Sequence, residues 1–281
     1  MIRDRLDSWR GRGPVVPVIP LIGANGHMGP VRRGLTLATL APHIERAFAG
    51  RKVPAVALAV NSPGGSPVQS ALIHDRIRAL SGEKGIPVRA FIEDVGASGG
   101  YWLACAGDTI YANENSIVGS IGVISASFGF SEAIARLGIE RRVHTAGENK
   151  GMLDPFRPER PRDIKRLREI QAEMHGNFSA LVRDRRGGRL TGPEKELFSG
   201  AFWTGRTARE LGLVDGIGDM RQVMRAEFGD KVRFRVLGER RGTLRRRLGL
   251  ADGDAGALSG DFASGALAAL EERSLWARFG L

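Results

Sequence analysis

The stretch IPVRAFIEDVGASGGYWLACAGD, residues 86–108, decides the fold. Residues 86–94 form an apolar run that predicts a buried strand. A glycine-rich turn follows and places Ser98 just before a second apolar run, which predicts a short helix through about Ala106. Serine and glycine favour turns and helix N-caps, and a serine on such a turn can also act as a nucleophile. Both interpretations of Ser98 stay open at this point.

The segments upstream of this stretch repeat the strand-then-helix pattern. Residues 53–62 are almost continuously apolar, as in a strand buried on both faces. Residues 67–85 predict a helix, and residues 37–50 predict another that ends at Gly50. The apolar side of the 67–85 helix is predicted to carry Val68, Leu72, Ile73, Ile77 and Leu80. Prolines interrupt the apolar run at 15–23, which predicts a strand near a sheet edge or at its start.

Downstream of Ser98 the elements become shorter, apart from one long helix. We predict strands at 109–113, 122–127 and 140–146, and short helices at 131–138 and 204–211, the last one ended by Gly212. The long helix is predicted from Pro161 to about Arg186, because Ile164, Leu167, Ile170, Met174, Phe178 and Leu181 recur at steps of three and four. Alternating strands and helices indicate an α/β fold with a mainly parallel sheet and flanking helices.

Composition limits the classes of function. The chain has 281 residues, 42% apolar and 26% charged, which suits a globular protein. Its single cysteine, Cys105, excludes an internal disulfide and any multi-cysteine metal site, and we expect no metal and no cofactor. The net charge of +11 suits an anionic membrane or nucleic acid, but no nucleic-acid-binding motif accompanies it. We therefore predict no specific nucleic-acid partner.

The chain divides into three parts. Residues 1–14 are predicted to be a basic extension, 15–235 the folded domain, and 236–281 a basic tail with an amphipathic helix at its end. No apolar run approaches the roughly 18 residues of a membrane span, and no secretion signal is visible. We expect a cytoplasmic protein, at most peripheral to the inner membrane face. The tail could bind an anionic bilayer or pack on a neighbouring subunit, and the sequence favours neither.

Three glycine-rich turns follow apolar runs, at 61–65, 96–100 and 119–122. Glycine lets the backbone approach a ligand closely, so such turns can bind an oxyanion or a phosphate through N–H groups. None of them matches a phosphate-binding loop or a dinucleotide fingerprint. An oxyanion hole and an ordinary structural turn remain the two interpretations.

A serine nucleophile needs a base. Of the five histidines, His43, His74 and His175 lie in predicted helices and are interpreted as surface or packing residues, which leaves His144 as the histidine candidate. Lys150 lies in a glycine-flanked loop close to it. A lysine acts as a base when its ammonium is desolvated or lies near another cation, whereas a lone loop lysine is ordinarily solvated.

Six segments in order resemble those of a known family. They are VIPLIG (18–23), AVNSPGG (59–65), DVGASGGYWLACAGDTIYAN (94–113), SIVGSIGVI (116–124), HTAGENKGMLDPF (144–156) and FWTGRTARELGLVDGIG (202–218). Together they resemble the signal peptide peptidase A (SppA/SohB) family of serine proteases, over most of residues 15–220. The resemblance implies a ClpP/crotonase-like fold.

The same resemblance assigns roles to residues of this chain. It implies a Ser/Lys dyad with Ser98 as the nucleophile and Lys150 as the general base. It implies an oxyanion hole of backbone N–H groups near Gly65 and at Gly99, with Gly64 as the neighbouring candidate. Ser120 could orient the lysine amine by a hydrogen bond. The chain has one copy of the core, as in short members, for which the resemblance implies ring-like homo-oligomers that share the dyad between protomers.

The favoured hypothesis is thus a serine endopeptidase that cleaves short apolar peptides such as remnant signal peptides. Family members commonly carry an N-terminal membrane anchor, which this sequence does not show, so access to membrane-embedded peptides is not implied. One alternative is a crotonase-like acyl-coenzyme A enzyme, for which Glu93 and Asp94 could supply the carboxylate. Another alternative is a catalytically silent, membrane-associated scaffold.

Overall fold

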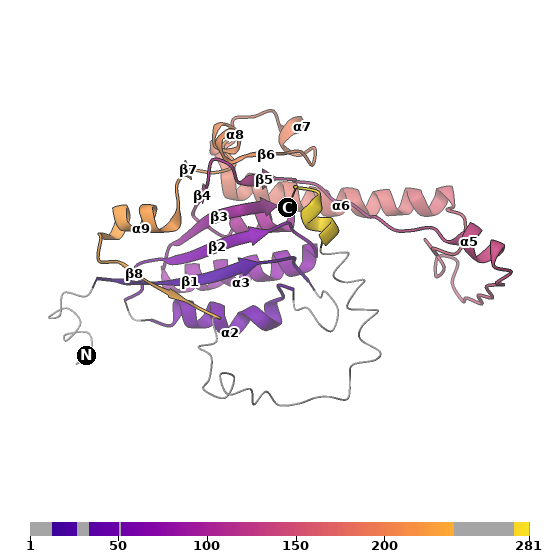
Figure 1. Ribbon diagram of the computed structural model, residues 1–281, viewed down its shortest axis with the longest axis horizontal. Helices are drawn as coiled ribbons and strands as arrows, with labels where there is room; N and C mark the ends of the chain where they lie inside the picture. The colour runs from indigo at the N-terminus through magenta and orange to yellow at the C-terminus, as the bar shows by residue number, and fades with distance from the viewer. Residues whose placement is uncertain (1–12, 27–33, 51, 239–272, 281) are drawn as a thin grey trace.

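The computed structural model describes residues 13–26, 34–50, 52–238 and 273–280. In this part of the chain the strands form one eight-stranded sheet with the order β6-β5-β3-β2-β1-β8, and β4 and β7 continue from β3 (Figure 1). Every strand pair is parallel except β5 with β6. The predicted α/β fold with a mainly parallel sheet is confirmed.

The strands are β1 (Val15–Ile22), β2 (Val56–Ser62), β3 (Val88–Ala97), β4 (Thr109–Ala112), β5 (Ile117–Gly119), β6 (Phe202–Thr204), β7 (Gly216–Ile217) and β8 (Arg233–Val236). The helices are α2 (Leu37–Phe48), α3 (Pro67–Lys84), α4 (Gly99–Ala104), α5 (Ser131–Arg136), α6 (Pro161–Arg186), α7 (Glu194–Leu197), α8 (Gly205–Glu210) and α9 (Met220–Phe228), with a 3₁₀ turn at Gly187–Arg189. The predicted bounds of α6 are confirmed.

The sheet has a different core on each face. Side chains alternate along a strand, so Leu58 and Val60 of β2 pack with α2, α3, α4 and α6 in the larger core. Ala57 and Ala59 face the other way and pack with Met224 of α9 and their neighbours.

Two sequence-based expectations about the body have different outcomes. β1 lies next to β8, the last strand of the described sheet, so its predicted place near a sheet edge is confirmed. Val68 and Leu72 of α3 are 59% and 42% exposed, whereas Ile73, Ile77 and Leu80 of the same predicted apolar side are buried. Apolar spacing alone does not say which of two adjacent apolar stripes meets the sheet.

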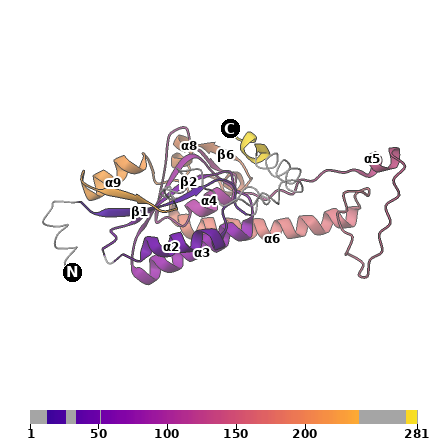
Figure 2. The same ribbon diagram turned by 60° about the horizontal axis from the view of Figure 1, so that its bottom comes forward.

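Two predicted strands are absent. Residues 122–127 and 140–146 take no regular structure and join no sheet. They belong to a projection that we call the arm, residues 122–160, which reaches beyond the end of the sheet together with the first half of α6 (Figures 1 and 2). Strand formation needs a neighbouring strand, and the described residues offer none there.

The chain ends fall mostly outside the described residues. This applies to residues 1–12 of the predicted extension and to 239–272 of the predicted tail. Of the expected C-terminal helix, residues 273–277 are helical, and Phe279 meets Phe202 edge-to-face at 5.2 Å between ring centroids. Among the helices described, none is both long and apolar enough to cross a bilayer.

Candidate active site

Ser98 occupies a strained turn between β3 and α4. Its backbone has φ 52° and ψ −124°, a conformation that residues other than glycine rarely adopt. Two hydrogen bonds hold the turn, from the Ser98 N–H to the Gly119 carbonyl (2.8 Å) and from the Trp102 N–H to the Ser98 carbonyl (3.0 Å). The Ser98 hydroxyl bonds to no other described residue. Strain of this kind is concentrated at functional sites, where surrounding structure maintains it.

The glycine turn at 61–65 lies directly against Ser98. A Cβ atom added to Gly64 would come within 2.8 Å of both the Ser98 Cβ and the Gly99 nitrogen. The Gly64 N–H donates to the Ser62 hydroxyl (3.2 Å). The N–H groups of Gly65 and Gly99 donate to no acceptor within the described ranges. Two unengaged N–H groups beside a serine hydroxyl are what an oxyanion hole requires.

A buried polar cluster beneath the two turns fixes them in place. The Asn25 amide donates to the Ser70 hydroxyl (2.8 Å) and accepts from the Ser62 hydroxyl (3.1 Å). A Cβ on Gly99 would lie 2.5 Å from the Ser70 hydroxyl, so glycine is the residue that fits. Sequence reasoning missed this cluster. Its signal was weak, because an asparagine and two serines near glycines look like ordinary turn residues.

A cavity of about 290 Å³ opens at Ser98, and we call it the Ser98 cavity. Its walls are Ser98, Ser120, Gly122, Val123, Ile124, Gln171, Ala172, His175, Phe198, Ser199, Gly200 and Arg278. Ser120, one of the predicted site residues, is 7% exposed and also has a positive φ of 52°. His175, interpreted from the sequence as a surface or packing residue, lines the cavity that holds Ser98. Periodicity predicted its helix but could not say what lies against each face.

Lys150 does not lie at Ser98 of the same chain. It is exposed in the arm and has no ion pair with any described residue. Next to it, Glu148 pairs with Arg162 at the start of α6, whereas the Ser98 cavity meets α6 at Gln171 and His175. At about 1.5 Å of rise per residue, these points on α6 are roughly 15–20 Å apart. His144 is likewise exposed on the arm.

The carboxylates of the crotonase hypothesis lie away from the cavity. Glu93 and Asp94 are exposed in the middle of β3 and line no part of the Ser98 cavity. Partial burial, with a smaller contribution from the Asp94 charge, raises the pKa of Glu93. Asp94 instead accepts a hydrogen bond from Asn61 at 2.7 Å. The described residues contain no cluster of three or more side chains able to hold a metal ion.

Cys105 is fully buried in the larger core. Burial raises the pKa of its thiol to about 12. The thiol therefore stays protonated at physiological pH and cannot compete with Ser98 as a nucleophile.

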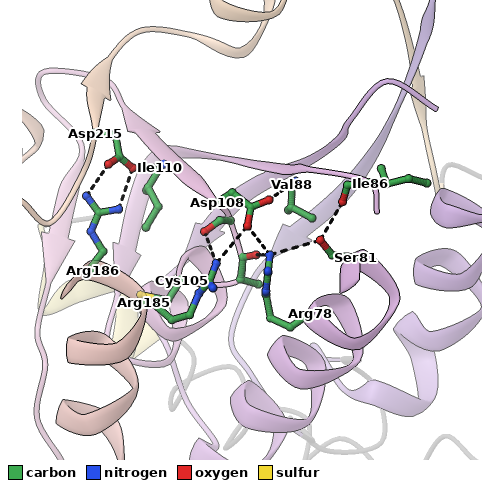
Figure 3. A network of polar contacts seen from close by, with 12 residues as sticks. Arg78, Ser81, Ile86, Val88, Cys105, Asp108, Ile110, Arg185, Arg186 and Asp215 are labelled. Carbon is green, nitrogen blue, oxygen red and sulfur yellow. Dashed lines mark hydrogen bonds and ion pairs between the residues drawn. The ribbon is translucent and has the colours of Figure 1, made fainter. Parts of the chain in front are cut away.

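A buried ion pair anchors the C-terminal end of α6 to the body (Figure 3). Arg186, 2% exposed, donates two hydrogen bonds to the Asp215 carboxylate at 2.8 and 3.0 Å. Asp215 also accepts from the Ile110 N–H of β4 at 2.7 Å. Burial acts to raise the pKa of Asp215, but the Arg186 and Ile110 hydrogen bonds and the arginine charges outweigh it and lower that pKa. The pair ties α6 to the sheet through β4.

Two further contacts hold α6 beside the Ser98 turn. Asp108 accepts from Arg78 of α3 at 2.7 Å and from Arg185 of α6 at 3.4 Å, so it joins these two helices (Figure 3). About two turns before this end, Phe178 stacks on Trp102 of α4 with ring centroids 4.8 Å apart. Because α4 begins directly after Ser98, α6 and the candidate nucleophile are fixed to the same short helix.

The chain matches a known peptidase family and is similar to several named proteins. A family model for peptidase family S49 matches residues 81–231. The chain is 33% identical over 168 residues to a putative signal peptide peptidase SppA of Enterococcus faecium, covering 60% of this chain and 48% of that relative. It is 33% identical over 207 residues to a putative protease of Synechocystis, covering 71% of this chain and 73% of that relative.

A third relative carries a different name. Over 272 residues the chain is 50% identical to a protein of Brucella abortus named Na(+)/H(+) antiporter NhaA, covering 95% of this chain. The chain spans 37% of that relative's length.

Proposed function

The chain belongs to peptidase family S49, for which a ClpP-like fold accords with the parallel sheet described above, and we propose that it is a serine endopeptidase with Ser98 and Lys150 as its dyad. The observation that carries the proposal is the strained Ser98 turn, which Gly64 contacts directly, while the N–H groups of Gly65 and Gly99 donate to no described acceptor. Both dyad residues lie within the 151 positions of the family match, 81–231.

Each residue has a defined role in the proposed reaction. The Ser98 hydroxyl attacks the peptide carbonyl while the Lys150 amine takes its proton. The N–H groups of Gly65 and Gly99 bind the oxyanion, and Gly64 allows the two turns to meet. The leaving amine then takes the proton from Lys150, and water, deprotonated by the same amine, hydrolyses the acyl-enzyme. Ser120, inside the cavity, orients the lysine amine.

We propose that neighbouring protomers share this site. Lys150 stands on the arm and cannot serve Ser98 of its own chain in the geometry above. The arm also exposes large apolar side chains, namely Ile124, Phe128, Phe130, Leu137 and Ile139. Exposed apolar surface of this kind marks a contact with another molecule. Packing of each arm on the next protomer would bury these side chains and bring Lys150, desolvated, to the neighbour's Ser98 in a ring-like homo-oligomer.

The proposed substrates are short, apolar, extended peptides such as remnant signal peptides. Residues 122–124 line the Ser98 cavity without joining the sheet, so their backbone groups can pair with an extended chain. The relatives named as peptidases and proteases support this substrate class for the family region. The cytoplasmic location stays a prediction, as does contact of the tail with a membrane.

The antiporter name belongs to a Brucella protein of which this chain spans 37%. Ion antiport is an activity of that whole protein, and we do not extend it to this chain. The crotonase alternative has little support, because Glu93 and Asp94 lie outside the cavity that holds Ser98.

Complementation between two inactive variants tests the proposal. Ser98→Ala and Lys150→Ala, expressed separately, should each lose more than about 10³-fold in hydrolysis of a quenched apolar peptide and keep their thermal unfolding temperature. Co-expressed with different tags, they should recover about a quarter of wild-type activity, because one interface in four then pairs an intact serine with an intact lysine. A fluorophosphonate probe should label Ser98 in the wild type.

Three other outcomes would each contradict a part of the proposal. Recovery of no activity from co-purified mixed oligomers would place both dyad residues in one chain. Full activity of Lys150→Ala, combined with loss in His144→Gln, would replace the Ser/Lys dyad by a Ser/His arrangement. Absence of probe labelling on an oligomer that is correctly folded would remove the serine-peptidase proposal altogether.

A further inference from the structure

One face of α6 runs from the anchored end of the helix into the Ser98 cavity. Gln171, His175, Phe178 and Val182 recur at steps of three and four, so they share that face. Phe178 and Val182 are buried in the larger core, and Phe178 stacks on Trp102. His175 and Gln171 continue the face outwards and line the cavity. The rigid part of α6 therefore fixes where His175 lies relative to Ser98.

The His175 imidazole has an unused nitrogen. Its Nε2 atom is buried, and no group in the described part of the chain makes a hydrogen bond with it. Buried polar atoms in folded proteins nearly always have a partner, because leaving one unpaired is costly. His175 lines the Ser98 cavity, so a group that enters the cavity lies next to this side chain.

The rest of the cavity restricts what that group can be. Val123, Ile124 and Phe198 supply apolar walls, while Gln171 and Ser120 supply polar groups near His175. The charged side chain among the lining residues, Arg278, is exposed and belongs to the C-terminal segment. A volume of about 290 Å³ lies at the lower end for ligand sites and suits one amino-acid side chain with its backbone.

We infer that His175 determines specificity by binding a hydroxyl or carboxamide side chain of the peptide, next to the scissile bond. The inference rests on the proposed peptidase function and adds a preference within the apolar substrate class, namely one polar, uncharged residue at the cleavage position. His175 Nε2 and the Gln171 amide hydrogen-bond that side chain, while the apolar walls contact its methyl and methylene groups. A site with buried hydrogen-bonding groups disfavours an isosteric substrate that lacks them, because the site is then left unpaired.

Isosteric peptide pairs test this inference. Quenched peptides that differ by Thr or Val, or by Asn or Leu, at the residues flanking the scissile bond have matched shapes and differ in hydrogen bonding. The wild type should cleave the Thr and Asn members with a kcat/KM about 10-fold or more above that of their apolar counterparts. His175→Phe should bring both ratios close to one. His175→Gln, which keeps a hydrogen-bonding group on a flexible side chain, should restore much of the preference.

A matched control lies on the same helix. Asn177 is exposed on α6 two residues further on, so Asn177→Ala should keep the wild-type ratios. The loss in His175→Phe should fall on KM more than on kcat, since the contact exists in the bound substrate as well as in the transition state. Fluorophosphonate labelling of Ser98 in both variants verifies that the nucleophile remains intact.

Two results would overturn the inference while the peptidase proposal stands. One is equal Thr/Val and Asn/Leu ratios in the wild type and His175→Phe. The other is a uniform fall in kcat for all four peptides in His175→Phe, which would make His175 part of the chemistry. If instead the wild type fails to label with the probe, or Ser98→Ala cleaves the peptides, the peptidase proposal itself fails and the inference with it.

Discussion

The two ends of α6 lie in opposite surroundings. At its C-terminal end, Phe178, Val182 and Arg186 are buried against α4 and the sheet. At its N-terminal end the same helix carries the arm, where Phe128 and Leu137 are 79% and 73% exposed. α5 has no buried residue. Among the described residues, the body therefore buries its apolar side chains within one chain, whereas the arm leaves several of its large apolar side chains exposed.

The largest effect on stability is expected at the anchored end. Arg186→Ala removes a buried guanidinium and the bidentate partner of the half-buried Asp215, which still pairs with the more exposed Arg189, and the free energy of unfolding should fall by about 3 kcal/mol. Arg183→Ala, one turn earlier, breaks an equally well-formed but exposed pair with Glu194 and should cost no more than about 1 kcal/mol. Urea unfolding of both variants measures the difference. Equal losses would mean that the Arg186–Asp215 pair does not anchor α6.

A comparable difference in unfolding free energy is expected between substitutions of two apolar residues of the same helix. Phe178→Ala should cost about 3 kcal/mol, because it removes a ring packed on Trp102 and leaves a cavity. Leu167→Ala, in the half of α6 that carries the arm, should cost less than about 1 kcal/mol for the isolated protomer, since Leu167 is only half-buried there. Denaturant unfolding at a concentration where the protein is monomeric gives both values. A large loss for Leu167→Ala would show that the body alone supports the whole helix.

Substitutions on the arm should change assembly and leave the protomer stable. Phe128→Ser with Leu137→Ser should shift the unfolding free energy of the monomer by no more than about 0.5 kcal/mol. The same variant should dissociate in analytical ultracentrifugation and lose more than about 10-fold in peptide hydrolysis, because Lys150 no longer reaches a neighbour. Val236→Ser, an exposed apolar residue of the body, is the control and should keep the assembly. Unchanged assembly of the arm variant would contradict the shared site.

The smallest expected effect is on the pH dependence of the unfolding free energy, and it arises in the body. Burial lowers the pKa of His74 on α3, against the opposing effect of the Asp75 carboxylate. The unfolded chain then binds a proton more readily than the folded one, so this contribution to stability is complete above about pH 6.5 and is lost as pH falls below it. His74→Gln should flatten the slope of unfolding free energy against pH below that value.

Asp215 adds to the same slope at lower pH. Its pKa is lowered in the folded state, so its stabilising contribution is present above the ordinary carboxyl range and is lost on acidification through it. A body that gains stability on acidification below pH 6 would contradict both assignments.

The sequence predicted the body well because its elements are long and bury one face in their own chain. The bounds of α6 and the strands that became β2 and β3 followed from apolar runs and periodicity. The strands predicted at 122–127 and 140–146 are wrong for a physical reason: valine, isoleucine and threonine favour strands only where a neighbouring strand is present to pair with them.

The candidate site, too, could be predicted from the sequence only in part. Ser98 and the glycine turns are recognisable locally, because a strained turn needs particular residues. His175 could not be found, since the sequence showed a histidine on a helix and gave no sign that its face opens into the cavity at Ser98. The separation of Lys150 from Ser98 within one chain was expected only from the family resemblance, which implies a dyad shared between protomers, because spacing along the chain says nothing about direction in space.

α6 is one continuous helix, so a small tilt at its buried end moves its far end by a larger distance. From Phe178 to the start of the helix is roughly 25 Å, so tilting the helix by about 5° at its buried end swings the tip by roughly 2 Å. Misplacing a reacting group by about 1 Å can cost on the order of 100-fold in rate. In the proposed shared site, the position of one protomer's amine relative to its neighbour's hydroxyl therefore depends on Arg186, Asp215 and Trp102, which do not line the Ser98 cavity.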